Sequence, residues 1–194
     1  MNRPWPNTTM AAEGMPRRRF TVAELEQMVE AGILPEDERI ELIGGEVVPL
    51  SPKGNRHELL KAALNVYWVR RLPEGLMLVT ETTFRLTPDT YLEPDFTFYL
   101  EDFGIKGLAP ATVPLVVEIA DSSLGYDLGR KAGLYAAFGV AELWVIDAVR
   151  LHTHVHREPA PSGYGSIRQF AADHVVEPRA SSALGVRLAE LDLR

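Results

Sequence analysis

Apolar residues recur at helical spacing in several segments of the chain. Thr21 followed by Glu24 has the form of a capping box, and apolar positions three and four residues apart continue to Val29. We therefore predict a helix that starts at Thr21 and ends near Gly32. A second amphipathic helix is predicted over residues 55–72 and a third over 127–140, with a shorter helical segment over 36–43. The apolar stripe of the second helix comprises Leu59, Leu60, Ala63, Leu64 and Tyr67.

Runs rich in β-branched and aromatic residues alternate with these helices. Residues 44–52 are typical of a turn that leads into a strand, and further strands are predicted over 75–86, 95–100, 115–120, 142–147 and 151–157. Connections that contain Pro or Gly separate them. The order of elements predicts an α/β fold with a mixed β-sheet flanked by helices and extra β-strands near the C-terminal end.

Length and composition indicate one folded domain. A chain of 194 residues fits a single domain, which we place at residues 20–194, after a flexible lead-in at 1–19 that is rich in Pro and polar residues. Nothing in the sequence has the length of a membrane span or the apolar stretch of a secretory signal, so we expect no membrane association. The absence of cysteine excludes disulfides, thiolate zinc sites and a cysteine nucleophile, and fits a cytoplasmic protein.

The net charge of −7 limits how this chain can bind nucleic acid. A protein that grips phosphates is usually basic, at least on one face, so DNA binding here would depend on a local basic patch. The run Arg17 to Arg19 is either an arm that contacts phosphates or a solvated lead-in. Alternatively, the acidic side chains bind a metal ion.

Two carboxylates lie at places where a sheet is expected. Asp95 comes directly before a predicted strand, and Glu118 lies inside an apolar one. A buried carboxylate is costly unless it is paired, hydrogen-bonded or bound to metal. Neighbouring antiparallel strands would bring both carboxylates to one end of the sheet, where Mg²⁺ favours oxygen ligands. The simpler alternative for Asp95 is that it caps a turn after Pro94.

Further charged residues are candidates for the same site. Lys131, in the helix after the Glu118 strand, could orient a nucleophile or stabilise charge on a phosphate, or could simply be a solvated residue beside Arg130. Glu41 is a candidate third carboxylate, with Glu46 as the competing acid. At the surface, Glu41 could instead pair with Arg39 or Lys53.

Three alternating histidines are a weaker metal candidate. His152, His154 and His156 would project from one face of a strand, about 6.6–7 Å apart, which is too far to converge on one ion. We therefore expect an exposed strand face.

Five blocks of sequence, taken in order, resemble a known family. These blocks are "RIELIGGEVVPLSPKGNRHELL", "EPDFTFYL", "PLVVEIADSS", "YDLGRKAGLYAAFGVAELWVID" and "GVRLAELDL". The chain is similar in them to the Uma-type family of putative restriction endonucleases, small bacterial proteins of the PD-(D/E)XK nuclease superfamily. The resemblance covers nearly all of the chain after about Arg19.

The resemblance implies a restriction-endonuclease-like core and a metal site formed by Glu41, Asp95 and Glu118. The lysine that the superfamily usually carries two positions after the third acid is replaced here by Ala120. In the family a lysine of the following helix compensates, which implies a catalytic role for Lys131. The resemblance also implies that His57 stands beside the site as an accessory residue. Asp121 departs from the family's usual pattern and adds a charge next to the third block.

These observations predict a Mg²⁺-dependent (or Mn²⁺-dependent) endonuclease that hydrolyses DNA phosphodiester bonds. A catalytically silent nuclease-like scaffold for binding or assembly is the alternative, and a hydrolase of smaller phosphate esters is a third. A homodimer is expected, because one nuclease domain cuts one strand and two-fold dimers are the commonest oligomers. Residues 185–193, predicted as exposed apolar strands, are the candidate interface.

Overall fold

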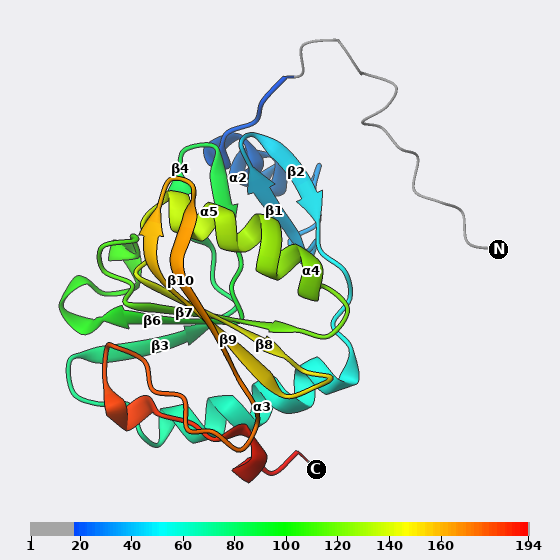
Figure 1. Cartoon of the computed structure of the whole chain (residues 1–194). Helices are drawn as coiled ribbons and strands as arrows, with labels where there is room; N and C mark the ends of the chain where they lie inside the picture. Colours follow the sequence, from blue (N-terminus) through cyan, green and yellow to red (C-terminus); the bar gives the residue numbers. More distant parts are fainter. Residues whose placement is uncertain (1–17, 194) are drawn as a thin grey trace. The chain divides into compact units, whose positions relative to one another are not determined.

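A computed structural model gives the structure of the chain and describes residues 18–193 (Figure 1). The chain divides into two compact units. The first comprises residues up to Leu50 together with Thr87–Tyr91, and the second comprises Ser51–Leu86 and the residues from Leu92 onward. The lead-in predicted at 1–19 lies outside the described residues up to position 17. Within the described part, Arg18 Nη2 lies 2.5 Å from Glu24 Oε1.

The first unit begins with the predicted capping box. Helix α2 (Val22–Glu30) starts after Thr21, whose side chain accepts a hydrogen bond from Glu24 N at 3.2 Å. The Glu24 carboxylate in turn accepts from Thr21 N at 2.9 Å, which confirms the predicted start of the helix. Burial of one face of α2 completes a small apolar cluster of Val22, Leu25, Ile40 and Leu42.

The helical segment predicted over residues 36–43 is wrong. Residues Ile40–Ile43 form strand β1, which pairs antiparallel with β2 (Glu46–Pro49) and, through Leu42 and Tyr91, with β5 (Thr90–Leu92). Gly44 and Gly45 have φ values of 58° and 81°, as the two central residues of a type I′ hairpin turn require. This turn selects the extended conformation for residues whose own propensities favour a helix.

The second unit is built on a six-stranded sheet of order β10-β9-β8-β7-β6-β3. Strands β7 and β8 are parallel and the other neighbours are antiparallel, which confirms the predicted mixed sheet. The predicted strand 75–86 is instead two strands, because the chain bends at Glu81, where φ is 50°. The six strands of this sheet are β3 (Leu76–Thr80), β6 (Phe96–Leu100), β7 (Leu115–Ala120), β8 (Glu142–Asp147), β9 (His152–Ala160) and β10 (Gly163–Phe170). Strand β4 (Phe84–Thr87) is not part of it.

Helix α3 (Asn55–Val69) supplies much of the core of this unit. Its buried residues are spaced three and four apart, and Trp68 is completely buried, with its ring 5.0 Å from Phe96 and 5.3 Å from Phe98 in edge-on contacts. Leu59, which the sequence placed in the apolar stripe, is 43% exposed. The buried stripe comprises His57, Leu60, Leu64 and Trp68.

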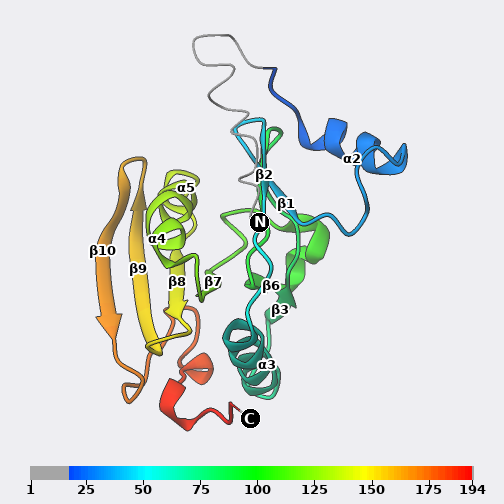
Figure 2. The same ribbon diagram turned by 90° about the vertical axis from the view of Figure 1, so that its right-hand side faces the viewer.

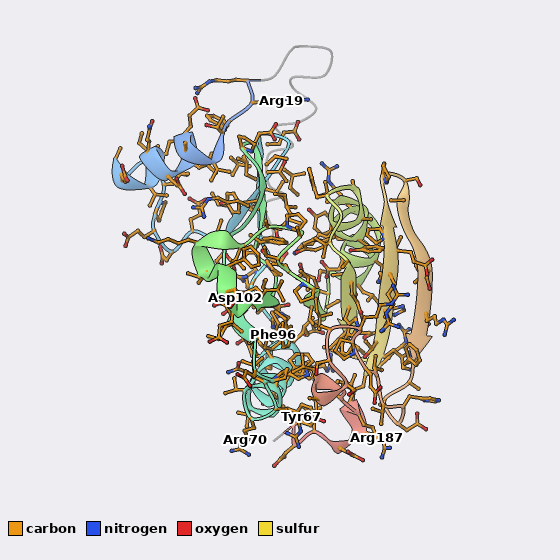
Figure 3. All side chains as sticks on the ribbon, turned by 90° about the vertical axis from the view of Figure 1, so that its left-hand side faces the viewer. Arg19, Tyr67, Arg70, Phe96, Asp102 and Arg187 are labelled. Atoms are coloured by element: carbon orange, nitrogen blue, oxygen red, sulfur yellow. The ribbon has the colours of Figure 1, made fainter. Side chains whose placement is uncertain are left out.

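The C-terminal segment packs against α3. Tyr67 donates its hydroxyl to Gly185 O at 2.6 Å, and Trp68 Nε1 donates to Leu184 O at 2.9 Å; Figure 3 shows Tyr67 facing the segment that carries Arg187. Val186 and Leu188 are buried in the core. The prediction of exposed apolar strands at 185–193 is therefore wrong, because these apolar residues cover α3 and the sheet. Val186 and Leu188 are therefore not available to the predicted dimer interface.

The helix predicted over 127–140 is confirmed with one irregularity. It comprises α4 (Leu124–Tyr126), a π-helical turn η3 (Asp127–Lys131) and α5 (Ala132–Ala137). Helix α5 lies along β9 and β10 (Figure 2). In Figure 1 this helix and α3 are both seen beside the sheet. None of the helices in the described part combines the length and apolar character needed to cross a membrane.

The predicted exposed histidine face is wrong. β9 lies between β8 and β10, so both of its edges are paired. His156 is only 1% exposed, and its ring lies 5.6 Å from that of Tyr164. Burial lowers the pKa of His156, which keeps this side chain neutral at pH 7. His152 and His154 are half-buried.

Trp68 tests how much the core depends on α3. We predict that Trp68→Ala lowers the free energy of unfolding by about 3–5 kcal/mol, because it removes a fully buried ring and leaves the Leu184 carbonyl without its donor. Urea denaturation measures this loss. The matched control is Val69→Ala, one residue later and 57% exposed, for which a change within about 0.5 kcal/mol is expected. Equal effects of the two substitutions would contradict this account of the core.

Candidate metal site at the β6–β7 edge

Two buried carboxylates face each other where β6 begins. The register pairs Phe96 with Val117, so the next position along the antiparallel ladder sets Asp95 opposite Glu118. Both residues are 4% exposed. The backbone N–H of Ile119 donates to Asp95 Oδ2 at 2.8 Å, so the side chain of Asp95 continues the ladder where the strand has not yet started. The predicted pairing of neighbouring antiparallel strands is confirmed.

Asp95 is surrounded by cationic and hydrogen-bonding partners. Lys53 Nζ lies 2.8 Å from Asp95 Oδ1, and His57 Nε2 lies 3.0 Å from the same carboxylate. Burial raises the pKa of Asp95, but the hydrogen bond and charge of His57, together with Lys53, outweigh burial and lower the pKa to about 2. Asp95 is therefore ionised at neutral pH. The simpler prediction, that Asp95 only caps a local turn, does not account for partners 38 and 42 residues away.

Glu118 has its own pair of partners, both from the helix that follows β7. Tyr135 donates its hydroxyl to Glu118 Oε1 at 2.6 Å, and Lys131 Nζ lies 2.8 Å from the same oxygen. Lys131 is only 4% exposed, so the alternative of a solvated residue beside Arg130 is wrong. Lys131 ends the π-helical turn, a local irregularity that is frequent at functional sites.

Glu41 belongs to the first unit. It lies in β1, opposite Val48, and its side chain is fully buried. Glu41 is therefore not a surface residue, while its pairing with Arg39 or Lys53 and its role as a third carboxylate both stay predictions. The competing acid, Glu46, is exposed in β2.

Asp121, the departure noted in the sequence, lies at the N-terminus of α3. A Cβ atom on Gly54, the N-cap residue, would be 2.4 Å from Asp121 Oδ2, so any other residue there would displace this carboxylate. Arg56 Nη1 lies 3.8 Å from Asp121 Oδ1. A negative charge is stabilising at a helix N-terminus. Asp121 thus lies beside the first turn of α3, two residues after the N–H that binds Asp95.

The sequence indicated some of these contacts and missed others. Lys131 and Tyr135 are four residues apart, the spacing that places two side chains on one helix face, and this signal identifies Tyr135 in retrospect. Lys53 carries no comparable signal, because it lies in the irregular segment before α3. Its other partner is Glu81, whose pKa burial raises but the hydrogen bonds from Lys53 and Lys61 lower overall.

The donor set is small but chemically suited to a hard cation. Among residues 18–193, no group of three or more His, Asp or Glu side chains is arranged to hold a metal ion. Asp95 and Glu118 together supply two carboxylates. Mg²⁺ is commonly held by one or two carboxylates, with water and substrate phosphates completing its coordination. Two adjacent carboxylates of this kind fit such an ion.

Comparisons with known proteins agree with the fold and the sequence blocks. Residues 22–190 match the model of the Uma2 family, described as "Putative restriction endonuclease". A crystal structure of a putative nuclease belonging to DUF820 from Anabaena variabilis ATCC 29413 is similar over 88% of this chain and 96% of that one, with a TM-score of 0.63 and 18% sequence identity. At that identity the likeness shows the fold alone. No curated protein matches the sequence.

Asp95 makes the stability of the chain sensitive to acid. Its pKa is lowered from 3.8 to about 2, so its contribution is complete above pH 3.8 and is lost as the pH falls through about 2. We predict that Asp95→Asn lowers the free energy of unfolding by roughly 2 kcal/mol at pH 7, and that the gap to the wild type closes between pH 4 and pH 2. Urea denaturation over this pH range measures both.

The control is Asp102→Asn, an exposed acid just after β6, which should change the free energy of unfolding by less than about 0.5 kcal/mol at either pH. A gap between wild type and Asp95→Asn that stays constant down to pH 2 would show that the charge of Asp95 does not stabilise the fold.

Proposed function

Because the chain belongs to the Uma2 family, described as "Putative restriction endonuclease", we propose that it is a Mg²⁺-dependent or Mn²⁺-dependent nuclease that hydrolyses DNA phosphodiester bonds. One observation carries the proposal. Two buried acids, Asp95 and Glu118, lie opposite each other in the β6–β7 register where β6 begins, and a buried lysine, Lys131, contacts one of them. The family and the nuclease fold support the reaction class, and these contacts support the assignment of residues.

In this proposal Asp95 and Glu118 hold the ion, with Glu41 as a candidate third ligand. A bound divalent ion would polarise the scissile phosphate and lower the pKa of a water molecule. Asp95 is ionised at neutral pH because its pKa is about 2, so it is ready to act as a ligand without losing a proton. His57 Nε2 and the N–H of Ile119 fix the orientation of its carboxylate.

Lys131 is the candidate cation for the reacting phosphate. Its ammonium group lies 2.8 Å from Glu118 Oε1, where it can orient the attacking water or stabilise negative charge that develops on the phosphate. Tyr135 shares the same carboxylate oxygen and therefore restrains the position of Glu118 while Lys131 acts. In this proposal Lys131 of the helix takes the place of a lysine in β7, where the chain has Ala120 instead.

A catalytically silent scaffold is the second candidate, and one observation favours it. Both oxygens of Asp95 already have protein partners, namely Lys53, His57 and Ile119 N. The net charge of −7 also weakens the encounter with DNA. Calorimetric titration with Mg²⁺ and Mn²⁺ separates the two candidates, since a scaffold with a vestigial site would show no binding at millimolar metal.

A homodimer remains part of the proposal. Cleavage of a duplex needs two active sites, and two-fold dimers are the commonest oligomers. Val186 and Leu188 are buried in the core, so these two residues would not contribute to the interface. We keep the cytoplasm as the proposed location on the ground that the chain has no cysteine.

The nuclease proposal predicts which substitutions abolish cleavage. Asp95→Asn, Glu118→Gln and Lys131→Met should each reduce metal-dependent cleavage of plasmid DNA at least ~100-fold, because each removes a ligand or the cation at the phosphate. Chelation with EDTA should abolish cleavage by the wild type.

Matched controls come from the same elements. Arg130→Met changes an exposed cation one residue before Lys131, and Glu101→Gln changes an exposed acid one residue after β6. Both should keep wild-type cleavage. Cleavage that persists in the double variant Asp95→Asn with Glu118→Gln would remove these residues from the mechanism.

A further inference from the structure

The carboxylate of Asp95 is part of a closed ring of charged side chains. Each member contacts the next, and acidic and basic groups alternate around it. We call this set the charge ring; in order it comprises Asp95, Lys53, Glu81, Lys61, Glu58 and His57. The mechanism above uses two of its members, Asp95 and His57, and gives no task to the other four.

Lys53 is the lysine of the charge ring that contacts Asp95. Its ammonium group contacts two carboxylates at once, Asp95 Oδ1 at 2.8 Å and Glu81 Oε1. Lys61 binds the same oxygen of Glu81 at 2.9 Å, but its second partner is Glu58 at 3.0 Å. Both lysine side chains are 15% exposed. The two lysines therefore share a partner and an environment, and differ in whether they reach the proposed metal ligand.

Glu81 is held beside Lys53 by an unusual backbone conformation. Its φ of 50° lies in the left-handed region, which is unfavourable for a residue with a side chain. Its N–H points to Pro94 O at 3.2 Å and to Asp95 O at 3.4 Å. The backbone of Glu81 is thus tied to Asp95 itself, and strain of this kind persists where the surroundings hold it in place. Glu81 is a stationary acceptor for Lys53.

We propose that Lys53 is a tethered cation that neutralises Asp95 in the metal-free protein and transfers to Glu81 when a divalent ion binds Asp95. This inference rests on the proposed function. An ammonium group and a divalent cation repel each other, so an ion that binds Asp95 competes with Lys53 for Oδ1. Because Glu81 already shares Lys53, the lysine needs only to give up one of its two partners. Lys53 is in this account a positioning residue that sets the metal affinity of the site.

The exchange has a consequence for the metal-free state. Asp95 is 4% exposed, and an unpaired charge there would be costly. Lys53 removes that cost by pairing with Asp95, but a metal ion that binds Asp95 must then displace the lysine. The protein therefore gains a stable metal-free site and loses part of its intrinsic affinity for the ion.

The test compares Mg²⁺ binding to two lysine variants by isothermal titration calorimetry. Lys53→Met removes the competitor of the ion, and should bind Mg²⁺ about tenfold more tightly than the wild type, a size typical of coupled binding. Lys61→Met removes the same charge from the same partner, Glu81, without touching Asp95. The Mg²⁺ affinity of Lys61→Met should stay within about threefold of that of the wild type.

A second pair of variants shifts affinity in the opposite direction. Glu81→Gln weakens the place to which Lys53 must move, so Mg²⁺ binding should weaken by about fivefold. The control, Glu58→Gln, removes an acid of the charge ring that contacts Lys61 and His57, and should change affinity less than Glu81→Gln. General damage to the fold would weaken binding in every variant, and would not tighten it in Lys53→Met.

The outcomes separate the two proposals. If the wild type binds Mg²⁺ and Lys53→Met binds no more tightly than Lys61→Met, the exchange is wrong and the nuclease proposal stands. If wild type and all variants fail to bind Mg²⁺ and Mn²⁺ at millimolar concentration, both the metal site and the exchange are wrong. Should Lys53→Met not fold, the comparison of Glu81→Gln with Glu58→Gln decides. Weaker Mg²⁺ binding by Glu81→Gln than by Glu58→Gln supports the exchange, and equal Mg²⁺ affinities of the two variants overturn it.

Discussion

The burial of one carboxylate governs the arrangement of the second unit. Asp95 is almost inaccessible to water and stays ionised, which is possible only because Lys53, His57 and the N–H of Ile119 surround it. These partners come from the segment before α3, the first turn of α3 and strand β7. Their contacts with one side chain bring together parts of the chain that are distant in sequence. An uncompensated charge at this place would oppose folding, so the partners and the carboxylate depend on each other.

The charge of the second carboxylate, Glu118, is also compensated, but by different partners. Glu118 lies opposite Asp95, and two adjacent negative charges repel each other strongly when they are buried. Each is compensated separately, Asp95 by Lys53 and His57 and Glu118 by Lys131. The pair is therefore stable without a metal ion, yet it keeps two hard oxygen ligands close together. In the proposed nuclease, this balance would let the site persist until an ion and a substrate arrive.

Local patterns predicted the elements that depend on local physics. The capping box at Thr21, the apolar run of β7 and the helix of residues 127–140 follow from spacing and composition, and the structure confirms them. Predictions failed where the neighbours of a segment decided its structure. The turn at Gly44 and Gly45 makes a hairpin of residues that favour a helix. His156 is buried against the ring of Tyr164 on the neighbouring strand, and packing on α3 buries apolar residues of the C-terminal segment that was expected to be exposed.

The sequence by itself determined that Glu118 had to find a partner, because an acid within an apolar strand cannot remain alone, and it indicated Asp95 and Lys131 as candidates. Only the tertiary structure decided how the charges are shared. The antiparallel register sets Asp95 opposite Glu118, Lys131 at the end of the π-helical turn contacts Glu118, and Lys53 contacts both Glu81 and Asp95. These contacts join residues up to 42 positions apart, and no local pattern encodes them, because charge pairing acts through space and depends on where the folded backbone brings each side chain.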